Sequence, residues 1–197
     1  MTARLVSIVG PPSVGKTTLA LWLAQALPAE FIREDYEGNP YLADAYAGVA
    51  EARLPSQMYF LLSRVEQLAI SAWPAGGCFV SDYGFCQDSI FAHTTLTGDD
   101  LHAYEKMARR LGGLVQRPDV LIHLDASVAT LLDRIARRGR SFEKSITAEF
   151  LSSMRQAHAR AVAEEAGAVI RVDCDKTDLL DSAARECLLA QLRGKLG

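Results

Sequence analysis

The sequence predicts an α/β fold in which helices sandwich a five-stranded parallel β-sheet. Short apolar runs alternate along the chain with longer stretches of helical periodicity. This alternation favours parallel strands joined by right-handed crossover helices. A glycine-rich loop also lies between the first apolar run and the first helical stretch. Both observations indicate a sheet whose strands end at a ligand-binding edge.

Five apolar runs are the candidate strands. The first is apolar apart from one serine, the second is short, the third follows Gly76 and Gly77, and the fourth and fifth follow Pro118 and Gly167. They cover residues 5–9, 30–33, 78–81, 120–124 and 168–172. Helical periodicity fills the intervals between them, over residues 18–27, 54–72, 99–111, 128–137, 147–165 and 178–192. Such intervals provide the helices that a parallel sheet needs on both faces.

Composition fits one intracellular domain. The 197 residues are 49% apolar, which suits a single domain over residues 1–197 with a mobile lid. A formal net charge of −3 argues against nucleic-acid binding. No apolar run is long enough for a membrane helix, and the start shows no signal peptide, so we expect a cytoplasmic protein. The four cysteines are scattered and are expected to be reduced thiols.

Residues 10–17 read Gly-Pro-Pro-Ser-Val-Gly-Lys-Thr and match the phosphate-loop pattern G-x-x-x-x-G-K-[ST] in full. Glycines allow backbone N–H groups to surround an anion, and the following helix adds its positive N-terminal dipole. Lys16 can reach the β- and γ-phosphates, and the Thr17 hydroxyl can bind Mg²⁺. The sequence therefore predicts a site for a nucleoside triphosphate, formed by Gly10, Pro11, Pro12, Ser13, Val14, Gly15, Lys16, Thr17 and Thr18.

Acidic residues follow several strands at the expected ligand-binding edge. Glu34 follows the second run, and its carboxylate can accept the proton of a hydroxyl nucleophile. Asp82 follows the third run, where an acid can reach Mg²⁺ beside the phosphate loop. A solvated loop acid is the alternative for Glu34, and a helix N-cap is the alternative for Asp82. Asp35 and Asp125 also follow strands.

Two further clusters suggest ligand contacts. Gln57 and Arg64 lie seven residues apart on one predicted helix, so both can point into one pocket, where an amide can pair with a nucleobase edge. Two exposed polar residues are the alternative. Arg134, Arg138 and Arg140 belong to a basic segment that can form a lid over phosphates. Favourable charges at a helix end are the alternative.

These segments together resemble the deoxynucleoside kinase family of P-loop kinases. Residues 34–42 are similar to its Glu-Pro-x-x-x-Asn-Pro-aromatic-Leu segment, and residues 57–64 to its Gln-x-x-x-x-x-x-Arg helix. Residues 81–83 lie where the family has an acid–Arg pair, and residues 88–92 where it has an Asp-x-hydrophobic-Phe-Ala stretch. Residues 134–143 are close to its Arg-x-x-x-Arg-Gly-Arg-x-x-Glu lid, which we place around residues 134–146.

The resemblance implies an ATP-dependent kinase that transfers the γ-phosphate of ATP to the 5′-hydroxyl of a (deoxy)nucleoside in nucleotide salvage. It implies Mg²⁺ as the cofactor, a homodimer, and no nucleic-acid or membrane partner. Glu34 would be the catalytic base, with Lys16, Asp82, Arg134 and Arg138 as further catalytic groups. Thr17 and Asp82 would hold the metal, and Arg140 would join the other lid arginines on ATP. The nucleoside would contact Glu34, Tyr46, Gln57, Arg64, Asp88 and Glu143.

Two positions depart from the family pattern, and both belong to the acceptor site. Tyr83 stands where the family has an arginine, so Arg33 or Arg64 is expected to replace that cation. Asp35 replaces the family proline. These departures leave open a second function, a related kinase acting on a nucleoside monophosphate or another small hydroxyl acceptor.

A third interpretation is a nucleotide switch that binds partners. Residues 35–38 read D-x-x-G, and residues 175–178 resemble a guanine-reading N/T-K-x-D. The first lies too close to the phosphate loop and the second begins with aspartate, so the kinase interpretation is preferred. The resemblance instead implies that residues 173–178 lie near the adenine of ATP.

Overall fold

The computed structural model describes residues 3–69, 73–74, 76–164 and 167–197. Its centre is one sheet with the strand order β2-β3-β1-β4-β5, in which every neighbouring pair is parallel. The strands are β1 Arg4–Val9, β2 Glu30–Ile32, β3 Cys78–Ser81, β4 Val120–Asp125 and β5 Ala168–Asp173. This confirms the predicted five-stranded parallel sheet, and each strand lies within one residue of its predicted ends.

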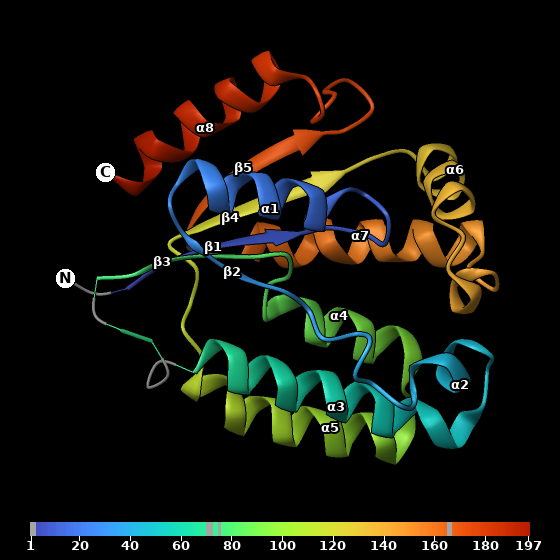
Figure 1. The fold of residues 1–197 in the computed structure, drawn as a ribbon. Helices are drawn as coiled ribbons and strands as arrows, with labels where there is room; N and C mark the ends of the chain where they lie inside the picture. The colour runs from blue at the N-terminus through green and yellow to red at the C-terminus, as the bar shows by residue number, and fades with distance from the viewer. Residues whose placement is uncertain (1–2, 70–72, 75, 165–166) are drawn as a thin grey trace.

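Helices cover both faces of the sheet (Figure 1). One face carries α1 (Lys16–Ala26) and α8 (Ser182–Leu196). The other carries α7 (Ala148–Glu164) and α4 (Cys86–Thr95), with α3 (Ala50–Leu68) and α5 (Gly98–Leu111) forming a further layer (Figure 1). No helix within the described residues is long and apolar enough to span a bilayer.

The alternation of side chains along β1 explains the two layers. Val6 and Ile8 are fully buried and pack in the same cluster as Leu23 of α1. Their neighbours point the other way, so Leu5 packs with Leu68 of α3. Since successive side chains of a strand face opposite sides, a run that is apolar throughout requires a helix layer on each face.

The sequence missed two helices and misplaced the starts of two others. Neither α2 (Leu42–Tyr46) nor α4 was predicted. Both are short, and α4 buries polar as well as apolar side chains, which hides its helical period. The helix α3 begins four residues before its predicted start, and Pro55 lies inside it. The predicted ends at residues 70–72 and 165 lie outside the described residues.

The helix α8 begins at Ser182, four residues later than predicted, because Asp181 caps it. The Asp181 carboxylate accepts the backbone N–H of Ala184 at 2.9 Å, and such a side-chain acceptor fixes a helix start.

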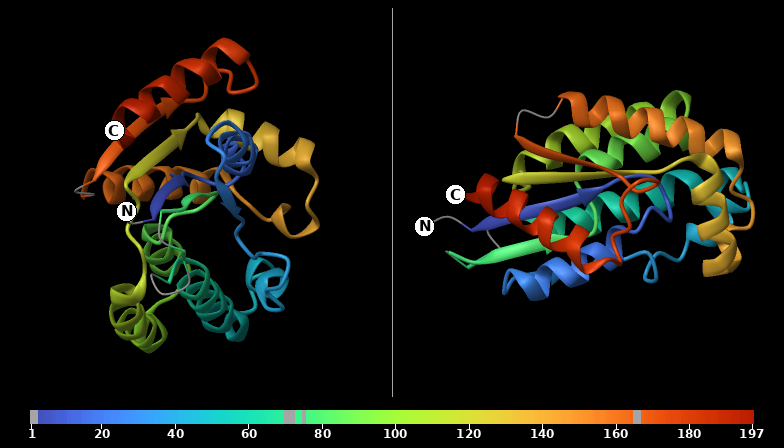
Figure 2. Two further views of the ribbon diagram at one scale, coloured as in Figure 1. Left: turned by 60° about the vertical axis from the view of Figure 1, so that its left-hand side comes forward. Right: turned by 90° about the horizontal axis from the view of Figure 1, so that it is seen from above.

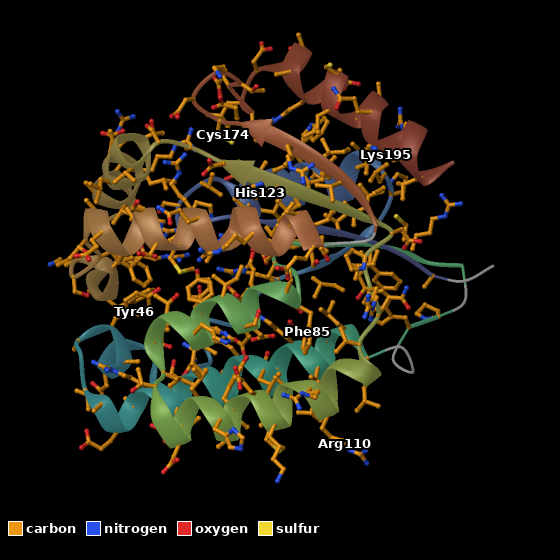
Figure 3. The ribbon with its side chains drawn as sticks, turned by 180° about the vertical axis from the view of Figure 1, so that it is seen from behind. Tyr46, Phe85, Arg110, His123, Cys174 and Lys195 are labelled. Atoms are coloured by element: carbon orange, nitrogen blue, oxygen red, sulfur yellow. The ribbon has the colours of Figure 1, made fainter. Side chains whose placement is uncertain are left out.

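The carboxyl ends of the strands all point to the same side of the molecule (Figure 2, right). The helix α6 (Val128–Arg138) and the lid segment that follows it lie at this edge. A view from behind places Tyr46 beside the lid and Cys174 near the end of β5 (Figure 3). Residues from distant parts of the sequence therefore meet at one edge.

Candidate active site

The phosphate loop turns tightly between β1 and α1. Gly10 has φ +149°, and a Cβ added there would lie 2.2 Å from the carbonyl oxygen of Leu124 in β4. Gly15 has φ +113° and precedes the first residue of α1. Side chains disfavour both backbone conformations, so the two glycines allow the loop to pack against the sheet and turn into the helix.

Lys16 folds over this loop. Its Nζ donates hydrogen bonds to the carbonyl oxygens of Gly10 at 2.8 Å and Pro11 at 3.0 Å. Burial lowers the pKa of Lys16 to about 8, although the carboxylates of Glu34 and Asp82 oppose the decrease. A cation held in this way is stabilised further when phosphate oxygens arrive.

Asp82 connects the phosphate loop to the end of β2. Its Oδ2 accepts the Thr17 hydroxyl at 2.5 Å, and its Oδ1 accepts the backbone N–H of Glu34 at 2.8 Å. Burial raises the pKa of Asp82, while the hydrogen bond from Thr17 opposes this increase. A buried carboxylate beside a hydroxyl, next to a phosphate-binding loop, fits Mg²⁺, which takes few protein ligands besides phosphates. The residues present therefore fit the predicted metal.

Arg64 is a buried cation between two acids. Its guanidinium donates to Oε1 of Glu34 and to Oδ1 of Asp88, and its side chain is 3% exposed. Burial alone would lower the pKa of Arg64, but the two carboxylates outweigh it and raise the pKa. Burial also raises the pKa of Asp88 to about 6, despite the charge of Arg64. Arg64 and Asp88, which were both predicted to contact the nucleoside, therefore form a buried ion pair with each other.

The structure shows which arginine lies near Tyr83, the residue that stands in place of the family arginine. The Arg64 guanidinium carbon lies 5.4 Å from the centre of the Tyr83 ring, and the Tyr83 hydroxyl donates to Gln67 at 2.6 Å. Arg33 instead pairs with Tyr36 and Glu37 on the surface. Of the two expected substitutes, Arg64 is therefore the arginine that contacts Glu34.

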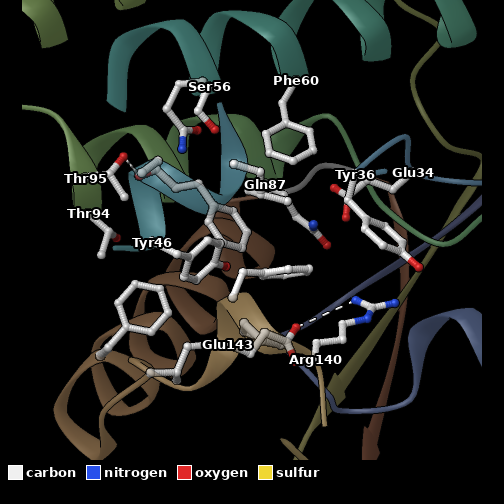
Figure 4. A pocket seen from close by; sticks show the side chains of 18 of the residues that line it. Glu34, Tyr36, Tyr46, Ser56, Phe60, Gln87, Thr94, Thr95, Arg140 and Glu143 are labelled. Atoms are coloured by element: carbon white, nitrogen blue, oxygen red, sulfur yellow. Dashed lines mark hydrogen bonds and ion pairs between the residues drawn. The ribbon is translucent and has the colours of Figure 1, made fainter. Parts of the chain in front are cut away.

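A cavity of about 390 Å³ opens beside these groups, and we call it the acceptor cavity. Glu34, Gln57, Arg64 and Asp82 line it, together with aromatic side chains from six segments of the chain. Figure 4 shows this cavity with Glu34, Tyr36, Tyr46 and Phe60 among its labelled residues. The aromatic residues are Tyr36, Tyr46, Phe60, Phe91, Phe142 and Phe150. Its volume is in the range of small-molecule sites.

The lid segment after α6 contacts the far side of this cavity. Arg138 donates to Glu143 with Nε to Oε2 at 3.0 Å, and Arg140 lies 4.0 Å above the Tyr36 ring. Phe142 packs on Tyr46 with ring centres 5.7 Å apart. Burial and the charge of Glu143 raise the pKa of Tyr46. The lid therefore closes over the acceptor cavity.

A second cavity of about 320 Å³ lies on the other side of the phosphate loop, and we call it the donor cavity. Residues of the loop line it with Arg134, Arg138 and the segment after β5, which contributes Cys174, Thr177, Asp178, Leu179 and Leu180. Arg134 donates to the carbonyl oxygen of Val14 at 2.8 Å. The two cavities share Ser13, Lys16, Thr17 and Arg138. They therefore meet where a phosphoryl group would pass from one to the other.

A model of the deoxynucleoside kinase family matches residues 6–194. The chain belongs to this family. It is 34% identical to deoxyguanosine kinase from Bacillus subtilis over 91% of this chain and 90% of that protein. It is also 34% identical to deoxyadenosine kinase from Dictyostelium discoideum, over 78% of this chain and 64% of that protein.

The fold of this deoxynucleoside kinase family member is similar to a solved structure of deoxyadenosine kinase from M. mycoides. The TM-score is 0.83 with 22% identity, over 97% of this chain and 99% of the other. The predicted family, fold and enzyme class are confirmed. The family match favours the kinase over the nucleotide switch. In the structure Asp35 accepts the N–H of Gly38, and Asp175 accepts the N–H of Ser127 at the start of α6.

The structure brings most predicted site residues together around the two cavities, with several differences. Of the predicted phosphate-loop residues, Gly10 and Pro11 line neither cavity, and their carbonyl oxygens accept hydrogen bonds from Lys16, whereas Pro12 lines the acceptor cavity alone.

Arg140 lines the acceptor cavity rather than the donor cavity. Asp88 lines neither, because its carboxylate is 2% exposed and bound to Arg64. Asp125, at the end of β4, pairs with Arg155 at 2.8 Å and lines neither cavity.

Sequence reasoning missed much of the lining of the acceptor cavity, including three residues on α3 and α4. Phe60 and Phe91 face it from α3 and α4, and Gln87 faces it from the first turn of α4. Gln87 sits beside Asp88, which matched a family position and drew the prediction. A correct prediction of α4 would have identified Gln87, since Gln87 and Phe91 lie four residues apart and so share one face of that helix.

Proposed function

We propose that this deoxynucleoside kinase family member transfers the γ-phosphate of ATP to the 5′-hydroxyl of a deoxynucleoside. The observation that carries the proposal is the meeting of the donor and acceptor cavities at Lys16, Thr17 and Arg138, with Glu34 in the acceptor wall. Phosphoryl transfer requires this arrangement, because the attacking and leaving oxygens must lie on opposite sides of the phosphorus.

Glu34 is the base in this mechanism. Arg64 engages one carboxylate oxygen of Glu34, which leaves the other to take the proton of the 5′-hydroxyl. Lys16 moves from the loop carbonyls to the β- and γ-phosphates, and its charge balances the negative charge of the transferred group. Arg134 and Arg138 contribute further positive charge from α6, and Tyr46 and Glu143 hold the 3′-hydroxyl.

Thr17 and Asp82 would hold Mg²⁺ through their neighbouring oxygens. The metal, when bound with ATP, neutralises charge on the β- and γ-phosphates. The sequence motif and the buried position of Asp82 support this assignment.

Transfer to a monophosphate or another alcohol was the alternative suggested by the absence of the family arginine. The position of Arg64 supports a nucleoside as the acceptor instead, because this arginine contacts Glu34, the proposed catalytic base, directly. The relatives named deoxyguanosine and deoxyadenosine kinase support it as well. A homodimer and a cytoplasmic location stay predictions from the family resemblance.

The test is a panel of phosphate acceptors with purified protein, ATP and Mg²⁺. The four deoxynucleosides, the matching ribonucleosides and the deoxynucleoside monophosphates are each supplied, and ADP formation is measured with and without EDTA. We expect Mg²⁺-dependent ADP formation with at least one deoxynucleoside and 5′-monophosphate as product. ADP formation with the monophosphates alone would establish the alternative. If none of the supplied acceptors gave ADP formation, both functions would be contradicted.

A further inference from the structure

We propose that Gln87 is a second base-reading residue, which together with Gln57 selects purines by contacting both polar edges of the base. The inference rests on the proposed function, because it concerns the acceptor cavity. It starts from two buried amides on different helices. Gln57 on α3 is 6% exposed, and Gln87 on α4 is 1% exposed.

Each of these amides contains a buried oxygen without a protein partner. Oε1 of Gln57 and Oε1 of Gln87 accept no hydrogen bond from any group in the described part of the chain. Buried polar atoms are nearly always paired, and an unpaired one is costly. Both side chains line the acceptor cavity, and Figure 4 shows Gln87 extending into it. A ligand in this cavity is therefore the missing partner.

The surroundings fit a planar aromatic ligand. Phe60 follows Gln57 by three residues on α3, and Phe91 follows Gln87 by four residues on α4. Both phenylalanines line the cavity, at helical spacings that place each ring on the same face as its glutamine. Each helix thus supplies one apolar surface for stacking and one amide for an edge.

The neighbouring charge is kept away from the base. Asp88 follows Gln87 directly, and Arg64 binds Oδ1 of its carboxylate, whereas Oδ2 is buried without a hydrogen-bond partner among the described residues. Asp88 does not line the cavity. Tyr104 of α5 is also buried next to Asp88, whose charge adds to burial in raising the pKa of Tyr104. Gln87 is therefore the residue of this pair that lines the acceptor cavity, and Asp88 lies behind it against Arg64.

Two amides can both be satisfied by a purine. An amide offers a donor and an acceptor together, and it can pair bidentately with N6 and N7 of adenine. Purines carry polar atoms on the Watson–Crick edge and also at N7. A pyrimidine carries only C–H or methyl groups at C5 and C6, so it would leave one amide unpaired. The pair of glutamines thus favours purines.

The test compares kcat/KM of wild type, Gln87→Met and Gln87→Glu for deoxyguanosine, deoxyadenosine, deoxycytidine and thymidine. Gln156→Met, the same exchange at an exposed site on α7, is the matched control. Gln87→Met should lower kcat/KM for the purine substrates by about 5- to 100-fold, with a much smaller change for pyrimidines. Gln87→Glu should raise the deoxyadenosine-to-deoxyguanosine ratio, because a carboxylate accepts from the N6 amino group but repels O6.

The melting temperature without ligand separates this role from a structural one. Gln87→Met should melt at or above the wild-type temperature, because it replaces an unpaired amide with an apolar side chain of similar size. A lower melting temperature with equal losses for all four substrates would overturn the inference. An unchanged purine-to-pyrimidine ratio in both variants of an active enzyme would also overturn it. If the wild type phosphorylates no deoxynucleoside, the proposed function fails first.

Discussion

Lys16 is a partly buried cation at the phosphate loop, and its removal should change how stability depends on pH. Burial lowers its pKa from 10.5 to about 8, against the opposing charges of Glu34 and Asp82. In the unfolded chain the ammonium has its ordinary pKa of about 10.4. Between about pH 8 and pH 10.5 the unfolded chain binds more protons than the folded protein, so the free energy of unfolding rises with pH.

The size of this effect follows from the pKa difference. The decrease of the Lys16 pKa from 10.5 to about 8, at about 1.36 kcal/mol for each unit of pKa, corresponds to at most about 3.4 kcal/mol. Raising the pH from about 7.5 to about 9.5 recovers about 2 kcal/mol of this. Lys16 is only partly shielded from solvent, which reduces the expected gain to about 1–2 kcal/mol.

The assay is urea unfolding of the wild type and Lys16→Met at several pH values over this range. Subtracting the two curves removes every group except Lys16, and the difference should favour the wild type increasingly as the pH rises. Lys106→Met, at an exposed position on α5, is the matched control. A non-hydrolysable ATP analogue should flatten the wild-type dependence, because phosphates return the pKa of Lys16 toward its ordinary value.

A flat difference between wild type and Lys16→Met over this pH range would refute the reasoning. It would mean that the ammonium is as well solvated in the folded protein as in the unfolded chain. A steep dependence that persists unchanged with the ATP analogue would place Lys16 away from the phosphates.

Two other substitutions test the contacts that hold the site in place, namely the buried ion pair of Arg64 and the close packing of Gly10. Arg64→Met leaves Asp88 buried without its cation, so the free energy of unfolding should fall by about 3–5 kcal/mol in urea titrations; a loss below about 1 kcal/mol would contradict the buried pair. Gly10→Ala places a Cβ 2.2 Å from the Leu124 carbonyl oxygen at φ +149°, and should cost at least about 1–3 kcal/mol in the same assay. Gly194→Ala in α8 is the control for Gly10→Ala, because a Cβ added at Gly194 meets nothing within 4 Å. Equal stability of the two variants would contradict the predicted clash.

The strands of the sheet could be predicted from the sequence because the patterns that mark them are local. Each strand is a short apolar run beside a turn residue, and the phosphate loop between β1 and α1 is a contiguous pattern. The strand order is not local, because it depends on which faces the helices bury. The short helices α2 and α4 lacked an amphipathic period, and so residues such as Gln87 were not placed on any element.

The site was predictable only where a motif fixes a residue in space. Lys16 and Thr17 are set by the loop, and Glu34 and Asp82 by the ends of their strands. The pairing of Arg64 with Glu34 could not be read from spacing, because it joins residues thirty positions apart on different elements. Asp88 shows the limit of transfer from a motif, since its burial against Arg64 depends on the packing of α3 on α4.

The central claim is that Glu34 takes the proton of a nucleoside hydroxyl while the phosphate loop holds ATP, and Glu34→Gln tests it most directly. Single-turnover phosphorylation with the best deoxynucleoside is compared for wild type, Glu34→Gln and the control Glu30→Gln, an exposed position at the start of β2, the strand that leads to Glu34. We expect Glu34→Gln to lower the rate by about 10²–10⁴-fold with ATP binding intact, and Glu30→Gln to match the wild type. A Glu34→Gln rate within about threefold of wild type would contradict the account.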